Sequence, residues 1–287
     1  MKHGCYSNGP LLIILCLYSF LLMSDAPQPL SNRAASTIKR LQHRRNRTRA
    51  GLSVLTGWRS VESAVQGGAE LAYVVATPDE WARPDLQQLL EPYPDVTRYS
   101  AEPDALNAVA PVATVQGVLA TVRIPPLSAD TVWTEARTAL VLDGVQDPGN
   151  VGTLIRTAAW FGLDAVIAGP GTAGLFHPAV LRAGMGGHWD LTLARHDALP
   201  DAITEARRAG FTCYGADLAG TPVQYWHPVH PSLLVIGSEA HGLSPALLNA
   251  LDEPVSISGA DDRGATESLN AAVAAGIVMH RWSVGAS

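Results

Sequence analysis

Four polar side chains in the second half of the chain follow apolar strands or glycine-rich turns. Asn150 lies at a predicted helix start, where its side chain can cap the helix, and Arg156 projects from the second turn of that helix. Glu239 and Asn270 come much later, in two further segments. An asparagine amide both donates and accepts hydrogen bonds, and a carboxylate can orient an amide or a guanidinium. Each of these side chains could therefore take part in a polar site.

A glycine pattern in residues 169–174 (GPGTAG) suggests a competing chemistry, dinucleotide binding, with Asp190 about twenty residues further on. However, Pro170 removes an N–H from the turn, and the next helix is expected only at His177 or Pro178. A dinucleotide site needs the helix to open within the glycines, so that its amino end faces the pyrophosphate. We therefore do not favour an NAD- or flavin-dependent oxidoreductase.

A second alternative is a serine hydrolase, because residues 237–242 (GSEAHG) place Ser238, Glu239 and His241 side by side after a strand. The pattern is not G-x-S-x-G, and neighbouring side chains on a turn point in different directions. These residues cannot form a proton relay, so hydrolysis is not expected.

The elements that must position the polar residues alternate between strand and helix. Apolar strands separated by helices predict a parallel sheet covered by helices on both faces. The expected strands are 139–145, 165–169, 211–216, 232–237 and 254–258, and the expected helices are 150–162, 177–185, 198–209, 244–251 and 267–282.

The first half predicts a smaller α/β unit. Residues 31–67 have helical spacing, 71–76 (LAYVVA) is a buried strand, 78–91 a helix and 118–124 a second strand. We expect a linker at 126–137, so that the domains cover 31–125 and 138–287.

Charge is distributed unevenly along the chain, whose net charge is -6. Residues 31–60 contain eight basic and no acidic residues, whereas the chain from Val61 onward contains 11 basic and 25 acidic ones. A basic segment on an acidic body predicts a local contact with a polyanion such as RNA; the alternative is a solvated helix face. The 47% hydrophobic composition excludes disorder, and the three cysteines match neither a disulfide framework nor a metal site.

The amino-terminal residues 1–30 are expected to be an apolar extension outside the folded protein. The apolar run 11–22 resembles the core of a signal peptide and is too short to span a bilayer. We expect a mis-assigned start, with translation beginning at or near Met23, and a cytoplasmic protein without a membrane partner.

The three polar segments together resemble the three motifs of the SpoU (TrmH-like) family of RNA ribose 2'-O-methyltransferases, in the SPOUT superfamily. They are 142–158 (LDGVQDPGNVGTLIRTA), 234–244 (LVIGSEAHGLS) and 267–277 (ESLNAAVAAGI). Residues 38–52 and 57–64 are similar to the family's L30e-like substrate-binding domain. Thr56 departs from that pattern, which usually has glutamate at this position.

The resemblance implies a carboxyl-terminal trefoil knot whose loops bind S-adenosylmethionine, largely through backbone groups. The residues carried over to this cofactor site are Gly237, Ile257, Leu269, Ala216 and Ser268. The usual proline and methionine after Ile257 are missing, and about three extra residues precede Ser268. The loop that bounds the cofactor is therefore expected to differ in shape.

The resemblance also places Arg156, Asn150, Glu239 and Asn270 in the catalytic site. The family describes the arginine as a general base, but a guanidinium with a pKa above about 12 is a poor base and could instead orient the ribose or bind a phosphate. Glu239 could fix either Arg156 or Asn150 by a charge-assisted hydrogen bond.

The RNA contacts expected from charge and resemblance are Arg40, Arg44, Arg45, Arg47, Arg49 and Arg182. Gly184 replaces a serine common in the family, so the contacts of its loop are expected to differ. The sequence thus predicts a homodimeric methyltransferase acting on RNA, preferably large-subunit ribosomal RNA, without a metal or a DNA partner. Methylation of transfer RNA and a catalytically silent RNA-binding protein are the competing interpretations.

Overall fold

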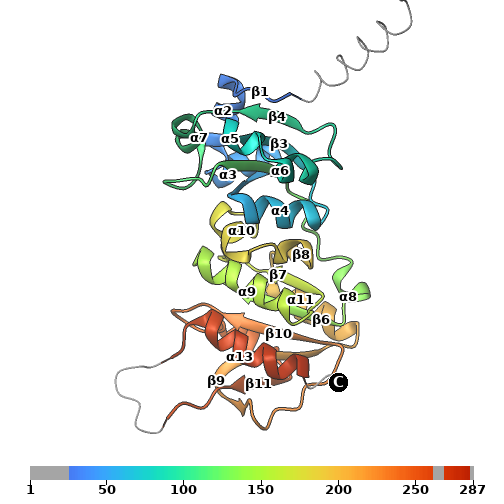
Figure 1. Cartoon of the computed structure of the whole chain (residues 1–287). Coiled ribbons are helices and arrows are strands. Elements are labelled where there is room, and N and C mark those ends of the chain that lie inside the picture. Colours follow the sequence, from blue (N-terminus) through green and yellow to red (C-terminus); the bar gives the residue numbers. More distant parts are fainter. Residues whose placement is uncertain (1–25, 261–267, 285–287) are drawn as a thin grey trace, which may run out of the picture.

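A computed structural model describes residues 26–260 and 268–284, which form two sheets one after the other along the chain (Figure 1). The first sheet has five strands in the order β1-β4-β3-β5-β2. Its strands are β1 Gln28–Pro29, β2 Leu52–Thr56, β3 Leu71–Ala76, β4 Thr97–Ser100 and β5 Val118–Arg123. Its helices are α2 Asn32–Arg40, α3 Arg44–Ala50, α4 Trp58–Gln66, α5 Pro78–Trp81, α6 Pro84–Leu89 and α7 Pro103–Val109.

Two predictions for this half are wrong in detail. The region expected to be helical contains strand β2, which pairs antiparallel with β5 and buries Val54 and Leu55. Gly51, at φ 63°, ends α3 and turns the chain into this strand. The single helix expected at 78–91 is two helices, because Pro84 restricts Arg83 to an extended conformation between them.

The second sheet has six parallel strands in the order β11-β9-β10-β6-β7-β8. They are β6 Thr138–Asp143, β7 Ala165–Ala168, β8 Thr192–Arg195, β9 Thr212–Pro222, β10 Ser232–Gly237 and β11 Glu253–Ser256. The helices of this half are α8 Val132–Glu135, α9 Pro148–Trp160, α10 Pro178–Gly184, the 3₁₀ helix η1 Gly187–Trp189, α11 Leu199–Arg208, α12 Pro245–Leu248 and α13 Ala271–Val284. The predicted strands are confirmed; edge strand β8 was not predicted, because its sequence TLAR carries little apolar signal.

Helices cover both faces of this sheet, as expected. Leu140 and Leu142 of β6 pack in one hydrophobic cluster with residues of α9 and α13. Ala139 and Val141 pack in another with residues of α11 and α12. Successive side chains of a strand point to opposite faces, so both faces of β6 are buried.

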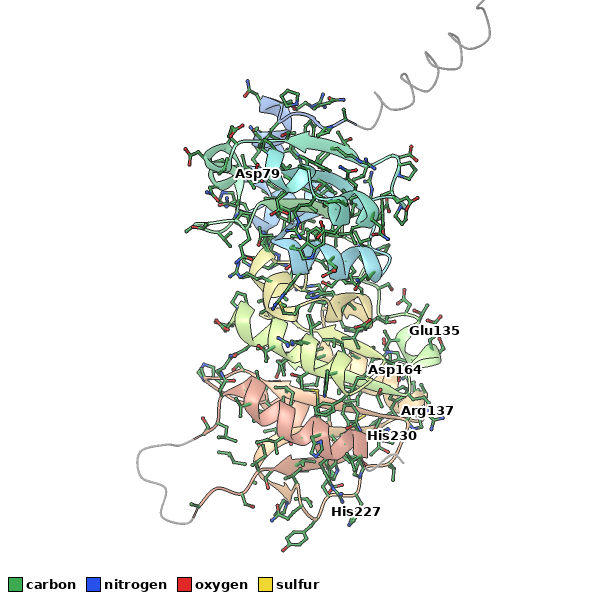
Figure 2. The ribbon with its side chains drawn as sticks, viewed as in Figure 1. Asp79, Glu135, Arg137, Asp164, His227 and His230 are labelled. Atoms are coloured by element: carbon green, nitrogen blue, oxygen red, sulfur yellow. The ribbon has the colours of Figure 1, made fainter. Side chains whose placement is uncertain are left out.

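The amino end of β6 is held by backbone hydrogen bonds to a carboxylate. Asp164, labelled beside Arg137 in Figure 2, accepts hydrogen bonds from the backbone N–H groups of Arg137 and Thr138, each at 2.8 Å. The opposite, carboxyl ends of the strands are thereby left for the candidate site.

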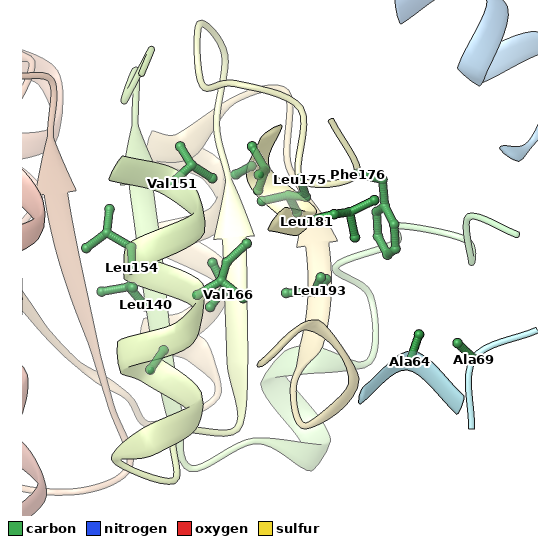
Figure 3. Close-up of a cluster of buried hydrophobic side chains, with 14 of the residues drawn as sticks. Ala64, Ala69, Leu140, Val151, Leu154, Val166, Leu175, Phe176, Leu181 and Leu193 are labelled. Atoms are coloured by element: carbon green, nitrogen blue, oxygen red, sulfur yellow. The ribbon is translucent and has the colours of Figure 1, made fainter. Parts of the chain in front are cut away.

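The two halves are packed together. Ser53 Oγ of β2 donates a 2.6 Å hydrogen bond to the carbonyl oxygen of Phe176, and one hydrophobic cluster includes Ala64 and Ala69 together with Phe176 and Leu181 (Figure 3). The segment 126–137, expected to be a linker, contains α8. Its Trp133 packs edge-on against Phe211, with the ring centroids 5.5 Å apart.

Three expectations concern the ends of the described residues. Residues 1–25 and 261–267 lie outside them, so the start at Met23 stays a prediction. The trefoil knot also stays a prediction. The sheet begins slightly earlier than residue 31, because Gln28–Pro29 pairs with β4. Within the described ranges, no helix is both long and apolar enough to cross a membrane.

Candidate functional site

A cavity of about 660 Å³ lies at the carboxyl ends of β10 and β11 and beside the middle of β9. All five residues predicted for the cofactor line it: Ala216, Gly237, Ile257, Ser268 and Leu269. Ala216 lies within β9, Gly237 ends β10, Ile257 follows β11, and Ser268 and Leu269 lie just before α13. The sheet order therefore brings together residues that are far apart in sequence.

Gly237 is required by the shape of the loop that bounds this cavity. The loop folds back on itself, because Ser238 N donates to Gly242 O at 3.0 Å and Gly242 N donates to Ser238 O at 2.9 Å. A Cβ added at Gly237 would lie 2.2 Å from the carbonyl carbon of Gly242. A larger residue at position 237 would open the loop and change the cavity wall.

Two ionisable residues of the cavity were not selected from the sequence as cofactor contacts. Asp217 directly follows Ala216 and His241 lies in the loop after β10; both line the cavity, as does Glu239. One Asp217 carboxylate oxygen, Oδ1, accepts a 2.9 Å hydrogen bond from Ala219 N. Its place beside a predicted cofactor residue at a strand end is the signal that could have identified Asp217.

Three predicted catalytic residues form one hydrogen-bonded chain. Asn150 Nδ2 donates to Glu239 Oε1 at 2.7 Å, and Asn270 Nδ2 donates to Asn150 Oδ1 at 3.0 Å. Asn270 Oδ1 in turn accepts hydrogen bonds from Ala272 N and Val273 N in the first turn of α13. The chain links the three sequence motifs, and of the two partners considered for Glu239 it selects Asn150.

The helix cap predicted at Asn150 is instead Asp147. Its Oδ1 accepts a 2.8 Å hydrogen bond from Asn150 N, and Pro148 occupies the first turn of α9. Asp147 satisfies the helix end, which leaves the Asn150 amide free to bond with Glu239 and Asn270.

Arg156 lies on the exposed face of α9, together with Thr153 and Trp160. Within residues 26–260 and 268–284 its guanidinium forms no ion pair, and it is not among the residues that line the cavity. Trp160, about one turn later, is 84% exposed. This face of α9 is therefore available to an RNA or to a second protein chain.

The predicted RNA-binding arginines of the first half divide into two groups. Arg40, Arg44, Arg45 and Arg49 are exposed on α2 and α3. Arg47 is only 5% exposed, and its Nη1 donates to the carbonyl oxygens of Leu41 at 2.9 Å and Gln42 at 2.8 Å. Burial, followed by the charge of Arg44, lowers the pKa of Arg47. The prediction of an RNA contact is wrong for Arg47, whose guanidinium instead holds the corner between α2 and α3.

Arg182 is exposed on α10, and the structure explains the nearby glycine. A Cβ at Gly184 would lie 2.4 Å from His188 Cε1, so the buried imidazole occupies the space of a side chain. His188 Nε2 is 2.9 Å from Leu175 O, and burial lowers the pKa of His188 to about 4. Gly184 thus has a packing function and faces away from solvent.

Both competing motifs have structural roles. Thr172 of the glycine pattern donates from Oγ1 to Leu142 O at 2.9 Å, and α10 begins only at Pro178. Ser238 Oγ accepts from His241 N at 3.2 Å, within a turn. Neither arrangement provides a pyrophosphate site or a hydrolytic relay.

Comparison with known proteins agrees with this arrangement. The model of the SpoU rRNA Methylase family matches residues 137–280, and that of the MRM3-like substrate binding domain matches residues 32–120. The 23S rRNA (guanosine(2553)-2'-O)-methyltransferase RlmP of Bacillus subtilis is 32% identical over 250 residues, covering 87% of this chain and 95% of the relative.

Solved structures show the same similarity over most of the chain. The SpoU methyltransferase AviRb from Streptomyces viridochromogenes, in complex with the cofactor AdoMet, has a TM-score of 0.78 at 28% identity, covering 88% of this chain and 98% of that one. A putative RNA methyltransferase of the TrmH family from Porphyromonas gingivalis has a TM-score of 0.75 at 29% identity, with the same coverage. The chain described here belongs to the SpoU rRNA methylase family.

Proposed function

We propose that this protein transfers a methyl group from S-adenosylmethionine to a ribose 2'-hydroxyl of RNA. The observation that carries the proposal is the Glu239–Asn150–Asn270 chain beside a cavity lined by all five predicted cofactor residues. The 2'-O-methyltransferase RlmP and the AdoMet-bound AviRb support both the reaction and the cofactor.

The residues of the cavity fit S-adenosylmethionine. Its volume of about 660 Å³ lies within the range of small-molecule sites, roughly 300–1,000 Å³. Ile257 and Leu269 would provide apolar contacts for the cofactor, and the loop after Gly237 would offer it backbone groups. The carboxylates of Asp217 and Glu239 favour a ligand with positive charge. When bound, the cofactor supplies an activated methyl group on a cationic sulfur.

The polar residues would position the acceptor ribose. The 2'-oxygen would form the new bond to the methyl carbon as the carbon–sulfur bond breaks, leaving the neutral thioether S-adenosylhomocysteine, and the hydroxyl proton would pass to water. In-line alignment supplies most of the acceleration in such a transfer. Asn150, held in one amide orientation by Glu239, and Asn270, held by the first turn of α13, are suited to align the ribose or the loop beside it.

We assign Arg156 to binding the ribose or its adjacent phosphate. A guanidinium acts as a base only when strongly desolvated, so its lasting charge favours a binding role for Arg156. Its planar set of donors matches the geometry of a phosphate.

RNA would bind across both sheets. Arg40, Arg44, Arg45 and Arg49 form an exposed basic surface on α2 and α3, and Arg182 on α10 adds a charge from the second half. The match of residues 32–120 to a substrate-binding domain supports this assignment, and with it the proposed domains 31–125 and 138–287.

A second copy of the chain would complete the active site. Val273 and Ile277 on α13 are 53% and 40% exposed, and with Trp160 they leave apolar surface on two helices that pack together. Arg156 also lies outside the cavity of its own chain, so we propose that the homodimer covers this surface. Sedimentation of the full chain would test the homodimer.

Large-subunit ribosomal RNA is the proposed substrate, because RlmP modifies 23S rRNA. We also propose a cytoplasmic location, where the cofactor and the RNA are found. The test is transfer of tritiated methyl from S-adenosylmethionine to undermethylated ribosomal and transfer RNA, followed by mapping of the modified nucleotide. Incorporation into transfer RNA alone would change the substrate. No incorporation, together with no cofactor binding by calorimetry, would contradict the enzyme and favour a silent RNA-binding protein.

A further inference from the structure

Residues 175–189, here called the junction segment, lie between helix α4 of the first half and helix α9, which carries Arg156. The segment comprises α10, a sharp turn and η1. On the side of α4 there is no space left. A Cβ added at Gly67 would lie 2.2 Å from Trp189 Cβ, and one added at Gly186 would lie 2.6 Å from Ser63 Cβ.

The other side of the junction segment is equally close to α9. A Cβ added at Gly187 would lie 3.1 Å from Arg156 Cα, 3.1 Å from Ala159 Cβ and 3.2 Å from Ile155 O. Two of these three atoms belong to the backbone of α9. The backbone of α9 at Arg156 therefore packs directly against η1, and only a residue without a side chain, Gly187, allows this close approach.

The junction segment is itself firmly packed. Its aromatic rings are in mutual contact, with centroids 6.1 Å apart for Phe176 and Trp189 and 5.7 Å apart for Phe176 and His188. The hydrogen bond from Ser53 to Phe176 O ties the segment to β2. Close-packed interiors transmit displacement rather than absorb it.

We propose that Gly187 is a positioning residue for Arg156, and that α4 sets the position of Arg156 through the junction segment. RNA bound to the first half would then be held at a fixed place relative to the arginine that contacts the ribose or phosphate. This inference rests on the proposed methyl transfer and adds to it a function for the packing between the two halves.

The test is Gly187→Ala in the full-length protein. The added methyl group forces α9 and η1 apart by a few tenths of an ångström, so we expect kcat to fall about tenfold, since misplacement by 1 Å can cost about a hundredfold. The KM for RNA and the affinity for S-adenosylmethionine should stay within about twofold. Gly174→Ala is the matched control, because a Cβ there meets nothing within 4 Å; its kinetics should be unchanged.

A second variant distinguishes an effect on the position of Arg156 from an effect on the stability of the fold. Gly187→Ala combined with Ala159→Gly removes one of the three close contacts, but places a glycine inside a helix, which lowers stability. We expect this double variant to have a lower melting temperature than Gly187→Ala and a higher kcat. If Gly187 has only a structural role, the double variant should have both a lower melting temperature and a lower kcat than Gly187→Ala.

Gly67→Ala tests the same path from the side of α4, and should lower kcat without changing cofactor affinity. If the wild type is active and neither Gly187→Ala nor Gly67→Ala changes kcat, the inference is overturned and the proposed function is unaffected. The same holds if the double variant is less active than Gly187→Ala. A wild type without methyl transfer would contradict the proposed function, and this inference with it.

Discussion

Asn150 and Glu239, 89 residues apart in sequence, are joined by a 2.7 Å hydrogen bond from Asn150 Nδ2 to Glu239 Oε1. Because a carboxylate only accepts hydrogen bonds, this contact fixes which end of the amide faces Glu239. Asn150 Oδ1 is then directed at Asn270 Nδ2, 3.0 Å away. Glu239 thus determines the orientation of the Asn150 amide, and the backbone N–H groups of Ala272 and Val273 give the Asn270 amide the matching orientation.

Glu239→Gln should lower kcat about tenfold to a hundredfold. The change removes the charge of the acceptor, and hydrogen bonds to charged groups contribute about 1.5–3 kcal/mol. Affinity for S-adenosylmethionine should also fall, because Glu239 lines the cavity. Single-turnover methylation and calorimetry measure the two effects. Glu91→Gln, at an exposed position of the first half, should change neither.

Arg156→Lys should retain only part of the activity, and Arg156→Ala should lose about a hundredfold or more in kcat. Lysine keeps the charge but not the planar set of donors that matches a phosphate. If Arg156 positions the substrate, the pH profile of kcat should have the same shape in Arg156→Lys and the wild type. A shift of the profile toward the pKa of the lysine would instead identify residue 156 as the base.

The residues that line the cavity could be named from the sequence, whereas some of the strands and helices around them could not be placed. Gly237, Ile257 and Leu269 could be named because the resemblance to the SpoU motifs carries them over, and all three line one cavity. Gly237 ends β10, Ile257 follows β11 and Leu269 precedes α13, so the order of the parallel strands brings them together. Strand β2 could not be placed, because its sequence LSVLT becomes a strand through pairing with β5.

The structural role of Arg47 could not be predicted from the sequence either. It lies among exposed arginines of identical type, and only the turn between α2 and α3 places two backbone carbonyl oxygens around it. A charge pattern identifies a basic surface but does not say which of its members is buried.

This difference predicts opposite effects for neighbouring arginines. Replacing Arg44, Arg45 and Arg49 with alanine should weaken RNA binding and flatten its salt dependence, because each lost phosphate contact releases about one counterion fewer. Cofactor affinity and the melting temperature should be nearly unchanged. RNA binding measured at several salt concentrations tests this; an unchanged slope would mean that these arginines are only a solvated face.

Arg47→Ala should instead destabilise the fold, by about 1–3 kcal/mol, because it leaves the carbonyl oxygens of Leu41 and Gln42 without their buried donor. Denaturant unfolding measures this loss. Destabilisation by the Arg44, Arg45 and Arg49 variant, with none by Arg47→Ala, would contradict the assignment.

His188 should make the fold sensitive to acid. Its pKa is lowered to about 4 by burial, whereas an unfolded histidine titrates near 6.5. The unfolded chain therefore binds the proton first, and stability contributed by the neutral imidazole is fully present above about pH 6.5 and is lost as the pH falls toward 4. The full loss is about 3 kcal/mol for this difference in pKa.

Other buried groups and carboxylates also titrate in this range, so the prediction concerns a difference between two proteins. His188→Phe keeps a ring in the space beside Gly184 and has no group to protonate. Its free energy of unfolding should fall less steeply than that of the wild type between pH 6.5 and pH 4, even if it is lower at pH 7. Parallel pH dependence of the two proteins, measured by urea unfolding, would show that His188 does not take up a proton on unfolding. The neutral, buried imidazole assigned here would then be wrong.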